Sequence, residues 1–274
     1  MINIIKASLY KLFKDKTFKV TLIIGICLAV FINLLYYLIF KNTSNGDSPN
    51  IFSGETALAN SLTPTSNFGL TVPINLVVFT IGEFTYGTIR NKIIAGHKKS
   101  SIYLALVITG FVFTLILMVS YCFLSWAIGS ILGGVHASGV IGENILWVII
   151  FGFTAYIFIM AFSVFIGTLT RSIGGSLPII IIFFVFLGLV PTFLNISNII
   201  KGNFDITSDL GSRIAMWVDP LFMVSLYTNT AVNTLLSSNK VTGEMIAAGI
   251  VSPLVYAGLF TVLGTYIFSK RDVK

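Results

Sequence analysis

The stretch GEFTYGTIRNKIIAGHKKS, residues Gly82–Ser100, is polar and basic although it separates two long apolar runs of the chain. It begins with an acid, Glu83, and ends in basic residues, an order of charge that complements the dipole of a helix. Its apolar residues fall mostly on one helical stripe, and Gly96 is suited to end that helix. The residues of the stripe are Phe84, Tyr86, Ile89, Ile93 and Ile94.

This pattern predicts a short amphipathic helix, residues 83–99, that lies along the membrane surface between two spanning helices. A partner outside the bilayer could hold such a helix and move both attached spans at once. The residues alone leave an alternative open, in which the stretch is a basic loop that only fixes the topology of the chain.

The composition indicates that lipid is the solvent of most of the surface. Of the 274 residues, 55% are hydrophobic and 10% are charged, and the mean hydropathy is +0.95. A soluble domain carries roughly 25% charged residues, which this chain lacks. The net charge of +7 does not indicate nucleic acid, because the basic residues lie at the ends of apolar runs and not on one polar face. Cys27 and Cys122 lie inside apolar runs without CxxC spacing, so they predict buried thiols and no disulfide framework.

The chain is therefore predicted to be an all-α membrane protein with one domain and six transmembrane helices, each of about 20 mostly apolar residues. Pro73 interrupts the second helix, Pro178 suits the first turn of the fifth, and Pro191 is expected to kink its far end. The first run is long enough to span and is followed by no cleavage pattern, so it is not expected to be a signal peptide. The predicted spans are residues 20–40, 68–88, 101–131, 145–170, 177–196 and 245–268.

The basic residues predict the orientation of these six spans. If both termini are cytoplasmic, thirteen of the 17 Lys and Arg residues fall on the inner side, whereas most acidic residues fall outside. Residues 1–19 are predicted to form an interfacial elbow helix on the inner leaflet, with Ile2, Ile5, Leu9, Leu12 and Phe13 on one face; a plain lysine-rich anchor is the alternative. Residues 197–243 are predicted to be extracellular, with one or two short helices over 214–236, although Asp219-Pro220 interrupts them. Two further spans in that segment are the alternative.

Catalytic chemistry is not indicated. A charge at the bilayer centre is costly and marks function by default, but no ionisable residue lies deep in a predicted span. His97 and His136 fall in connections, and no zinc motif or pair of nucleophile and base is seen. We therefore expect no metal site and no catalytic residue, and the energy for any transport must come from elsewhere.

The sequence GEFTYGTIRNKIIAGHKKSSIYLAL resembles the segment that leads into the third span of type II ABC exporter permeases. The likeness lies in an acidic residue, a Gly-Thr pair and an inner basic stretch, and the elbow helix, six spans and outer helices agree with that family's plan. His97-Lys98-Lys99 replaces the arginine that is usual near the end of the stretch. The resemblance implies a cytoplasmic coupling helix that docks into the ATP-binding subunit, with Glu83, Tyr86, Gly87, Thr88, Arg90, Lys92, His97, Lys98 and Lys99 as coupling residues.

The resemblance also implies the partners. Two permease chains, identical or paralogous, would join two copies of an ABC ATP-binding protein in the bacterial cytoplasmic membrane. This chain has no GxxxxGK[ST] phosphate loop, so it is expected to be no enzyme and to hold no cofactor, while ATP and Mg bind to the partner.

By analogy with the family, the second and fifth spans would line the substrate path. No charge lies on that path, so an apolar or amphipathic cargo is expected, such as an antimicrobial or toxin peptide; the chain resembles permeases of peptide export and of bacitracin or lantibiotic self-protection. Export of lipids or drugs is an alternative. A self-standing secondary transporter or channel is a rival, although neither internal repeats nor buried ionisable groups support it. The candidate path residues are Asn67, Thr71, Asn75, Thr80, Phe183, Phe184 and Phe186.

Overall fold

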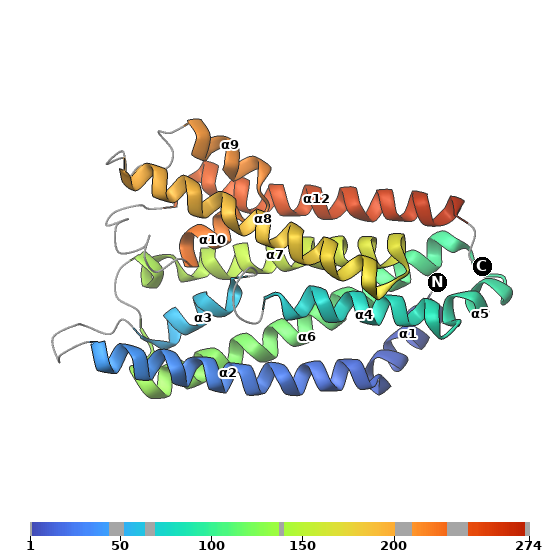
Figure 1. Ribbon diagram of the computed structural model, residues 1–274, viewed down its shortest axis with the longest axis horizontal. Coiled ribbons are helices and arrows are strands. Elements are labelled where there is room, and N and C mark those ends of the chain that lie inside the picture. Colours follow the sequence, from blue (N-terminus) through green and yellow to red (C-terminus); the bar gives the residue numbers. More distant parts are fainter. Residues whose placement is uncertain are drawn as a thin grey trace.

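The computed structural model describes residues 2–43, 52–63, 69–136, 140–200, 210–228 and 241–271. All regular secondary structure in these ranges is helical, which confirms the all-α prediction. Figure 1 shows a bundle of long helices with short helices at its two ends. The helices are α1 (Ile2–Lys14), α2 (Lys16–Thr43), α3 (Gly54–Leu62), α4 (Thr71–Thr85), α5 (Thr88–Ile94), α6 (Lys99–Gly133), α7 (Val140–Thr170), α8 (Ile173–Ile200), α9 (Leu210–Val218), α10 (Phe222–Thr228) and α12 (Gly243–Lys270).

The long apolar helices make the chain a multi-pass membrane protein. Four helices, α2, α6, α7 and α12, are long and apolar enough to cross a bilayer, and they contain the predicted first, third, fourth and sixth spans. The predicted second span, residues 68–88, contains α4, and α4 and α5 together form a fifth candidate if this bent pair is one span. The predicted fifth span lies in α8, whose described apolar part, Ile173–Leu189, is shorter. Length and composition thus support four or five spans.

The helices differ in how much of their apolar surface they bury. α6 and α7 form the buried centre, whereas α2 and α12 expose large apolar side chains such as Phe31 and Val262. The rings of Phe158, Phe162 and Phe260 join α7 to α12, and Phe183 of α8 stacks on Phe162 with ring centroids 4.1 Å apart. Aromatic packing of this kind holds helices together where the hydrophobic effect between them is weak, as it is in lipid.

The short helix α3 was not predicted, yet it packs closely against α6. A β-carbon on Gly129 would lie 2.7 Å from that of Ala57, and one on Gly133 would lie 1.9 Å from the carbonyl oxygen of Phe52. A capping box begins the helix, because Ser53 and Thr56 each accept a hydrogen bond from the other's backbone N–H. Glycines on α6 thus allow α3 to approach its backbone.

At the N-terminus, the structure corrects the predicted boundary at residue 19. α1 ends at Lys14 and α2 begins at Lys16, because the Asp15 carboxylate accepts a hydrogen bond from the backbone N–H of Thr17, at 2.8 Å. The buried face of α1 also differs from the predicted stripe. Ile4, Ser8 and Leu12 are buried, whereas Ile5 and Leu9 are partly buried and Phe13 is exposed.

The two ends of the bundle differ in charge. α1, α5 and the final turn of α12 lie at one end, together with both chain termini, and α3, α9 and α10 lie at the other (Figure 1). We call the first of these the basic end, since it carries the lysines of α1 and α5 and the final Lys270 and Arg271. At the other end, α9 and α10 are two short helices separated at Asp219-Pro220. The prediction of one or two short helices over residues 214–236 is met in part, since α9 begins earlier, at Leu210, and residues 229–236 lie outside the described residues.

Candidate functional site

The stretch Gly82–Ser100 forms two helices at the basic end, not the single helix predicted over residues 83–99. α4 ends at Thr85 and α5 begins at Thr88, and the pair is bent by 50°. Gly87 takes the left-handed conformation at this bend, with φ of 67°, which glycine adopts without steric cost. Gly96 follows α5 with φ of 82°, in agreement with its predicted role as a stop. Glu83 therefore lies in the last turn of α4 and not at the start of the coupling segment.

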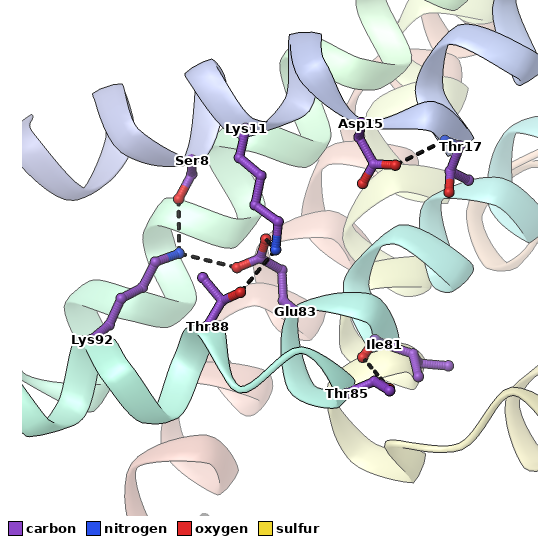
Figure 2. Close-up of polar contacts among 9 residues, drawn as sticks. All are labelled: Ser8, Lys11, Asp15, Thr17, Ile81, Glu83, Thr85, Thr88 and Lys92. Carbon is purple, nitrogen blue, oxygen red and sulfur yellow. Dashed lines mark hydrogen bonds and ion pairs between the residues drawn. The ribbon is translucent and has the colours of Figure 1, made fainter.

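Glu83 is the centre of a polar cluster that joins three helices (Figure 2). Its Oε1 lies 2.7 Å from Nζ of Lys11 in α1, and its Oε2 lies 3.1 Å from Nζ of Lys92 in α5. Lys11 also donates a hydrogen bond to Oγ1 of Thr88, at 2.8 Å, and Lys92 donates one to Oγ of Ser8, at 3.0 Å. Each lysine thus spans from one helix to another, and both converge on one carboxylate. We call these five residues the Glu83 cluster.

The Glu83 carboxylate is removed from water, since its side chain is only 1% exposed. A buried charge is tolerated only when it is paired and hydrogen-bonded, and removing one partner leaves the other uncompensated. Here the two lysines are less buried than the acid, at 31% and 13% exposed. The cluster therefore holds α1 and α5 against the end of α4.

The outer surface of this region is apolar and basic. Tyr86 and Ile94 are 76% and 75% exposed, and Arg90, His97 and Lys98 are exposed beside them. Ile89, on the opposite side of α5, is fully buried. Because only part of the predicted stripe is buried, Tyr86 in the turn before α5 and Ile94 at the end of α5 present large side chains outward together with positive charge. Such a mixed surface is suited to binding a partner with an apolar socket and an acidic rim.

The predicted coupling residues are therefore only partly brought together. Glu83, Thr88 and Lys92 share one cluster, while Gly87 shapes the bend. Lys99 is separate, since it lies in the first turn of α6 and its Nζ donates a hydrogen bond to the carbonyl oxygen of Arg271, at 2.9 Å. The basic residues of this stretch thus make contacts at two places: Lys92 contacts α1, and Lys99 contacts Arg271 at the end of α12.

The predicted substrate-path residues that the structure describes lie in different surroundings on α4 and α8. Thr80 is buried in α4, where Gly167 of α7 allows its close approach, and Asn75 donates a hydrogen bond to the carbonyl oxygen of Thr71 at 2.8 Å. In α8, Phe184 is buried and Phe183 stacks on α7, whereas Phe186 is exposed on the opposite side. Asn67 lies outside the described residues. α4 and α8 do contact one another, so these two helices are neighbours as expected.

Two members of the Glu83 cluster, Ser8 and Lys11, were not predicted as part of the site. Both residues fall on the face of α1 that also carries Ile4 and Leu12. This is the face that α1 buries in the bundle. A polar pair on an otherwise apolar face was the only available signal. Among the described residues, no group of three His, Cys, Asp or Glu side chains could hold a metal ion.

A family model described as a protein of unknown function, DUF2705, matches residues 26–274. Neither the curated proteins nor the solved structures contain a match.

Proposed function

The chain belongs to the DUF2705 family, and we propose that it is the membrane-spanning permease subunit of an ATP-driven ABC exporter. In this proposal it spans the bacterial cytoplasmic membrane six times with both termini inside, and the basic end is cytoplasmic. The resemblance of Gly82–Ser100 to the coupling segment of type II exporter permeases is one support. The bias of Lys and Arg toward that end is a second.

The observation that carries the proposal is the Glu83 cluster. An isolated basic loop needs no buried carboxylate, but a segment that transmits force must be held firmly to the helices that it moves. Glu83 ties α5 to α4 through Lys92 and to α1 through Lys11, so a displacement of α5 would also move the beginning of α2. The exposed Tyr86, Arg90 and Ile94 would contact the partner.

The expected assembly has two permease chains and two ATP-binding chains. ATP and Mg bind to the partner, and its closure pushes α5 and switches the two-chain bundle from inward-facing to outward-facing. The substrate is an apolar or amphipathic compound, most readily a peptide, because the helices proposed to line the path carry no charged side chain among their described residues apart from those of the Glu83 cluster at the basic end.

Co-purification with an ATP-binding chain tests this proposal. The tagged chain is expressed together with each phosphate-loop ATPase that a neighbouring reading frame encodes, and any complex is isolated in detergent. We expect the triple change Tyr86→Ala, Arg90→Ala and Ile94→Ala to release the ATPase, since these side chains are exposed and would contact the partner. Arg213→Ala, at the opposite end, is the matched control.

Reconstituted vesicles provide the second part of the test. Transport should require both the ATPase chain and ATP, and it should stop when the triple variant replaces the native chain. Transport by the chain alone, driven by an ion gradient, would favour a secondary transporter and overturn the proposal.

A further inference from the structure

A second basic site lies at the same end of the bundle, apart from the Glu83 cluster. The last turn of α7 and the last two turns of α12 line a small cavity that is open at its mouth. Arg171, directly after α7, and Arg271, directly after α12, contribute its two charged side chains. The other lining residues are Phe165, Thr168, Leu169, Gly264, Ile267 and Phe268.

The two arginines are held in place by specific contacts. Nη1 of Arg271 donates a hydrogen bond to the carbonyl oxygen of Leu169, and the backbone carbonyl of Arg271 accepts one from Lys99, at 2.9 Å. The guanidinium of Arg171 lies 5.3 Å from the centre of the Phe84 ring, a cation–π distance. Each side chain thus has a contact to a neighbouring helix, although Arg271 itself is exposed.

The backbone at Arg171 supports a specific placement of this side chain. Its φ of 53° makes it the one non-glycine residue with positive φ among the described residues. This conformation is unfavourable for a residue with a β-carbon. Strained backbone of this kind persists where the surroundings over-determine it, and it is common at ligand sites.

Two like charges at one cavity repel each other. The neighbouring Arg271 contributes to lowering the pKa of the Arg171 guanidinium, after the larger effect of burial. An anion between the two groups would turn this repulsion into attraction, and a guanidinium matches the geometry of phosphate oxygens with paired N–H donors.

The cavity is apolar on its other side. Phe165, Leu169, Ile267 and Phe268 belong to the two candidate spanning helices α7 and α12, and the arginines lie just beyond the ends of these helices. The charged rim therefore falls at the level where the hydrocarbon of a bilayer gives way to headgroups. Basic pockets between membrane helices at this level bind anionic headgroups.

We propose that the open mouth of this cavity binds the phosphate of an anionic phospholipid, with Arg171 and Arg271 holding the phosphate and the apolar side chains contacting the adjoining acyl chain. The ligand is a lipid and not a free phosphate, because half of the cavity wall is apolar. This inference does not depend on the proposed export function, since it uses no coupling residue and no partner chain.

Native mass spectrometry of the full chain in detergent tests the proposal. The protein is titrated with dioleoylphosphatidylglycerol, with dioleoylphosphatidylcholine and with inorganic phosphate. We expect preferential binding of the anionic lipid, and a loss of roughly tenfold or more in the double variant Arg171→Gln, Arg271→Gln, since each lost hydrogen bond involves a charged group. If the double variant does not fold, Arg271→Gln alone replaces it in the titration, because Arg271 is exposed and lies beyond the last helix.

Lys98→Gln is the matched control, because it removes one positive charge from an exposed position at the same end. It should leave lipid binding unchanged. The proposal is overturned if the two lipids bind equally, or if Lys98→Gln loses as much as the arginine variants. Binding of inorganic phosphate as tightly as of the anionic lipid, with the same dependence on arginine, would exclude the lipid as the ligand.

Discussion

The carboxylate of Glu83 and the ammonium of Lys92 lie 3.1 Å apart across the 50° bend between α4 and α5. The ion pair closes the bend from inside, because both side chains point toward α1, where Lys11 completes the contact (Figure 2). The angle between the two helices thus depends on one buried acid. Variants of Glu83 and of Gly87 distinguish the contribution of the ion pairs to stability from that of the backbone turn.

Glu83→Gln should destabilise the chain by about 3–5 kcal/mol, because it leaves two partly buried lysines beside a neutral amide. Glu83→Lys should be worse, and under the proposed function it should abolish the stimulation of the partner's ATPase. The measurement is the midpoint of thermal unfolding of the purified chain in detergent. The exchange Glu83→Lys with Lys92→Glu restores an opposite pair across the bend and should recover part of the loss.

Lys6→Gln is the control for this series, since Lys6 is exposed on α1 and its change should alter stability by less than about 0.5 kcal/mol. If Glu83→Gln unfolded at the same temperature as the native chain, the cluster would not hold the helices together.

Gly87→Ala should weaken the bend through backbone conformation alone. A β-carbon at this position would meet no atom within 4 Å, so any cost comes from the positive φ and amounts to roughly 1–2 kcal/mol. Gly87→Asn should cost less, because asparagine adopts the left-handed region more readily. Thermal unfolding of both variants provides the order of stability.

Gly174→Ala, in the first turn of α8, is the matched control because its β-carbon also meets no atom and its φ is not positive. It should be neutral or stabilising by up to about 1 kcal/mol. Equal losses in Gly87→Ala and Gly174→Ala would contradict the conformational explanation.

The long apolar helices could be predicted from the sequence because a span of about 20 apolar residues is a local property of the chain. Each of the apolar runs that form α2, α6, α7 and α12 contains such a span. The break before Leu221 was predicted for the same reason, since Asp219-Pro220 is a local signal for the end of a helix.

What the sequence did not reveal depends on two segments at once. Gly54–Leu62 has neither the length nor the apolar content of a span, and its helix is held by glycines of α6 far along the chain. The pairing of Lys11 with Glu83 likewise joins two segments that no local pattern relates. The single helix predicted over residues 83–99 was wrong at Gly87. The prediction used the order of acidic and basic residues, and this order is the same in a straight helix and in a bent pair.

Gly129→Ala and Gly133→Ala should displace α3 from α6. The new β-carbon would lie within 3 Å of Ala57 or of the Phe52 backbone, and backbone atoms cannot move aside cheaply. The expected loss of stability is roughly 1–3 kcal/mol, with Gly133→Ala the larger. Gly258→Ala, in α12, meets no atom and should have no comparable effect.

Thiol labelling reports on this displacement directly. Cys122 is buried in α6, where its sulfur accepts a hydrogen bond from Ser61 of α3, at 3.2 Å. In a Cys27→Ser background, maleimide should label Cys122 faster in Gly129→Ala than in the native chain. Unchanged labelling together with unchanged unfolding would show that α3 tolerates the larger residue.

Asp219 should make stability depend on pH. The residue lies between α9 and α10 and is only 4% exposed; its Oδ1 accepts a hydrogen bond from the backbone N–H of Leu221 at 2.9 Å, and its Oδ2 has no hydrogen-bond partner among the described residues. Burial raises the pKa of this carboxyl from 3.8 to about 7, although the hydrogen bond from Leu221 acts in the opposite direction. The folded chain therefore binds this proton more tightly than the unfolded chain does.

It follows that the free energy of unfolding should fall as the pH rises from about 4 to about 7, by roughly 4 kcal/mol at most, and should level off above that range. Asp219→Asn keeps the acceptor for Leu221 but removes the ionisation. The variant should lose this part of the pH dependence, and it should unfold at a higher temperature than the native chain at pH 8.

Glu244→Gln is the control, because Glu244 is a more exposed carboxylate at the same end, where it pairs with Arg213 at 2.9 Å. The slope between pH 4 and 7 should persist in this variant. The measurement is the unfolding midpoint of all three chains across that range in one detergent. An equal slope in Asp219→Asn and the native chain would show that Asp219 is ionised in the folded state at acidic pH, despite its burial between the two helices.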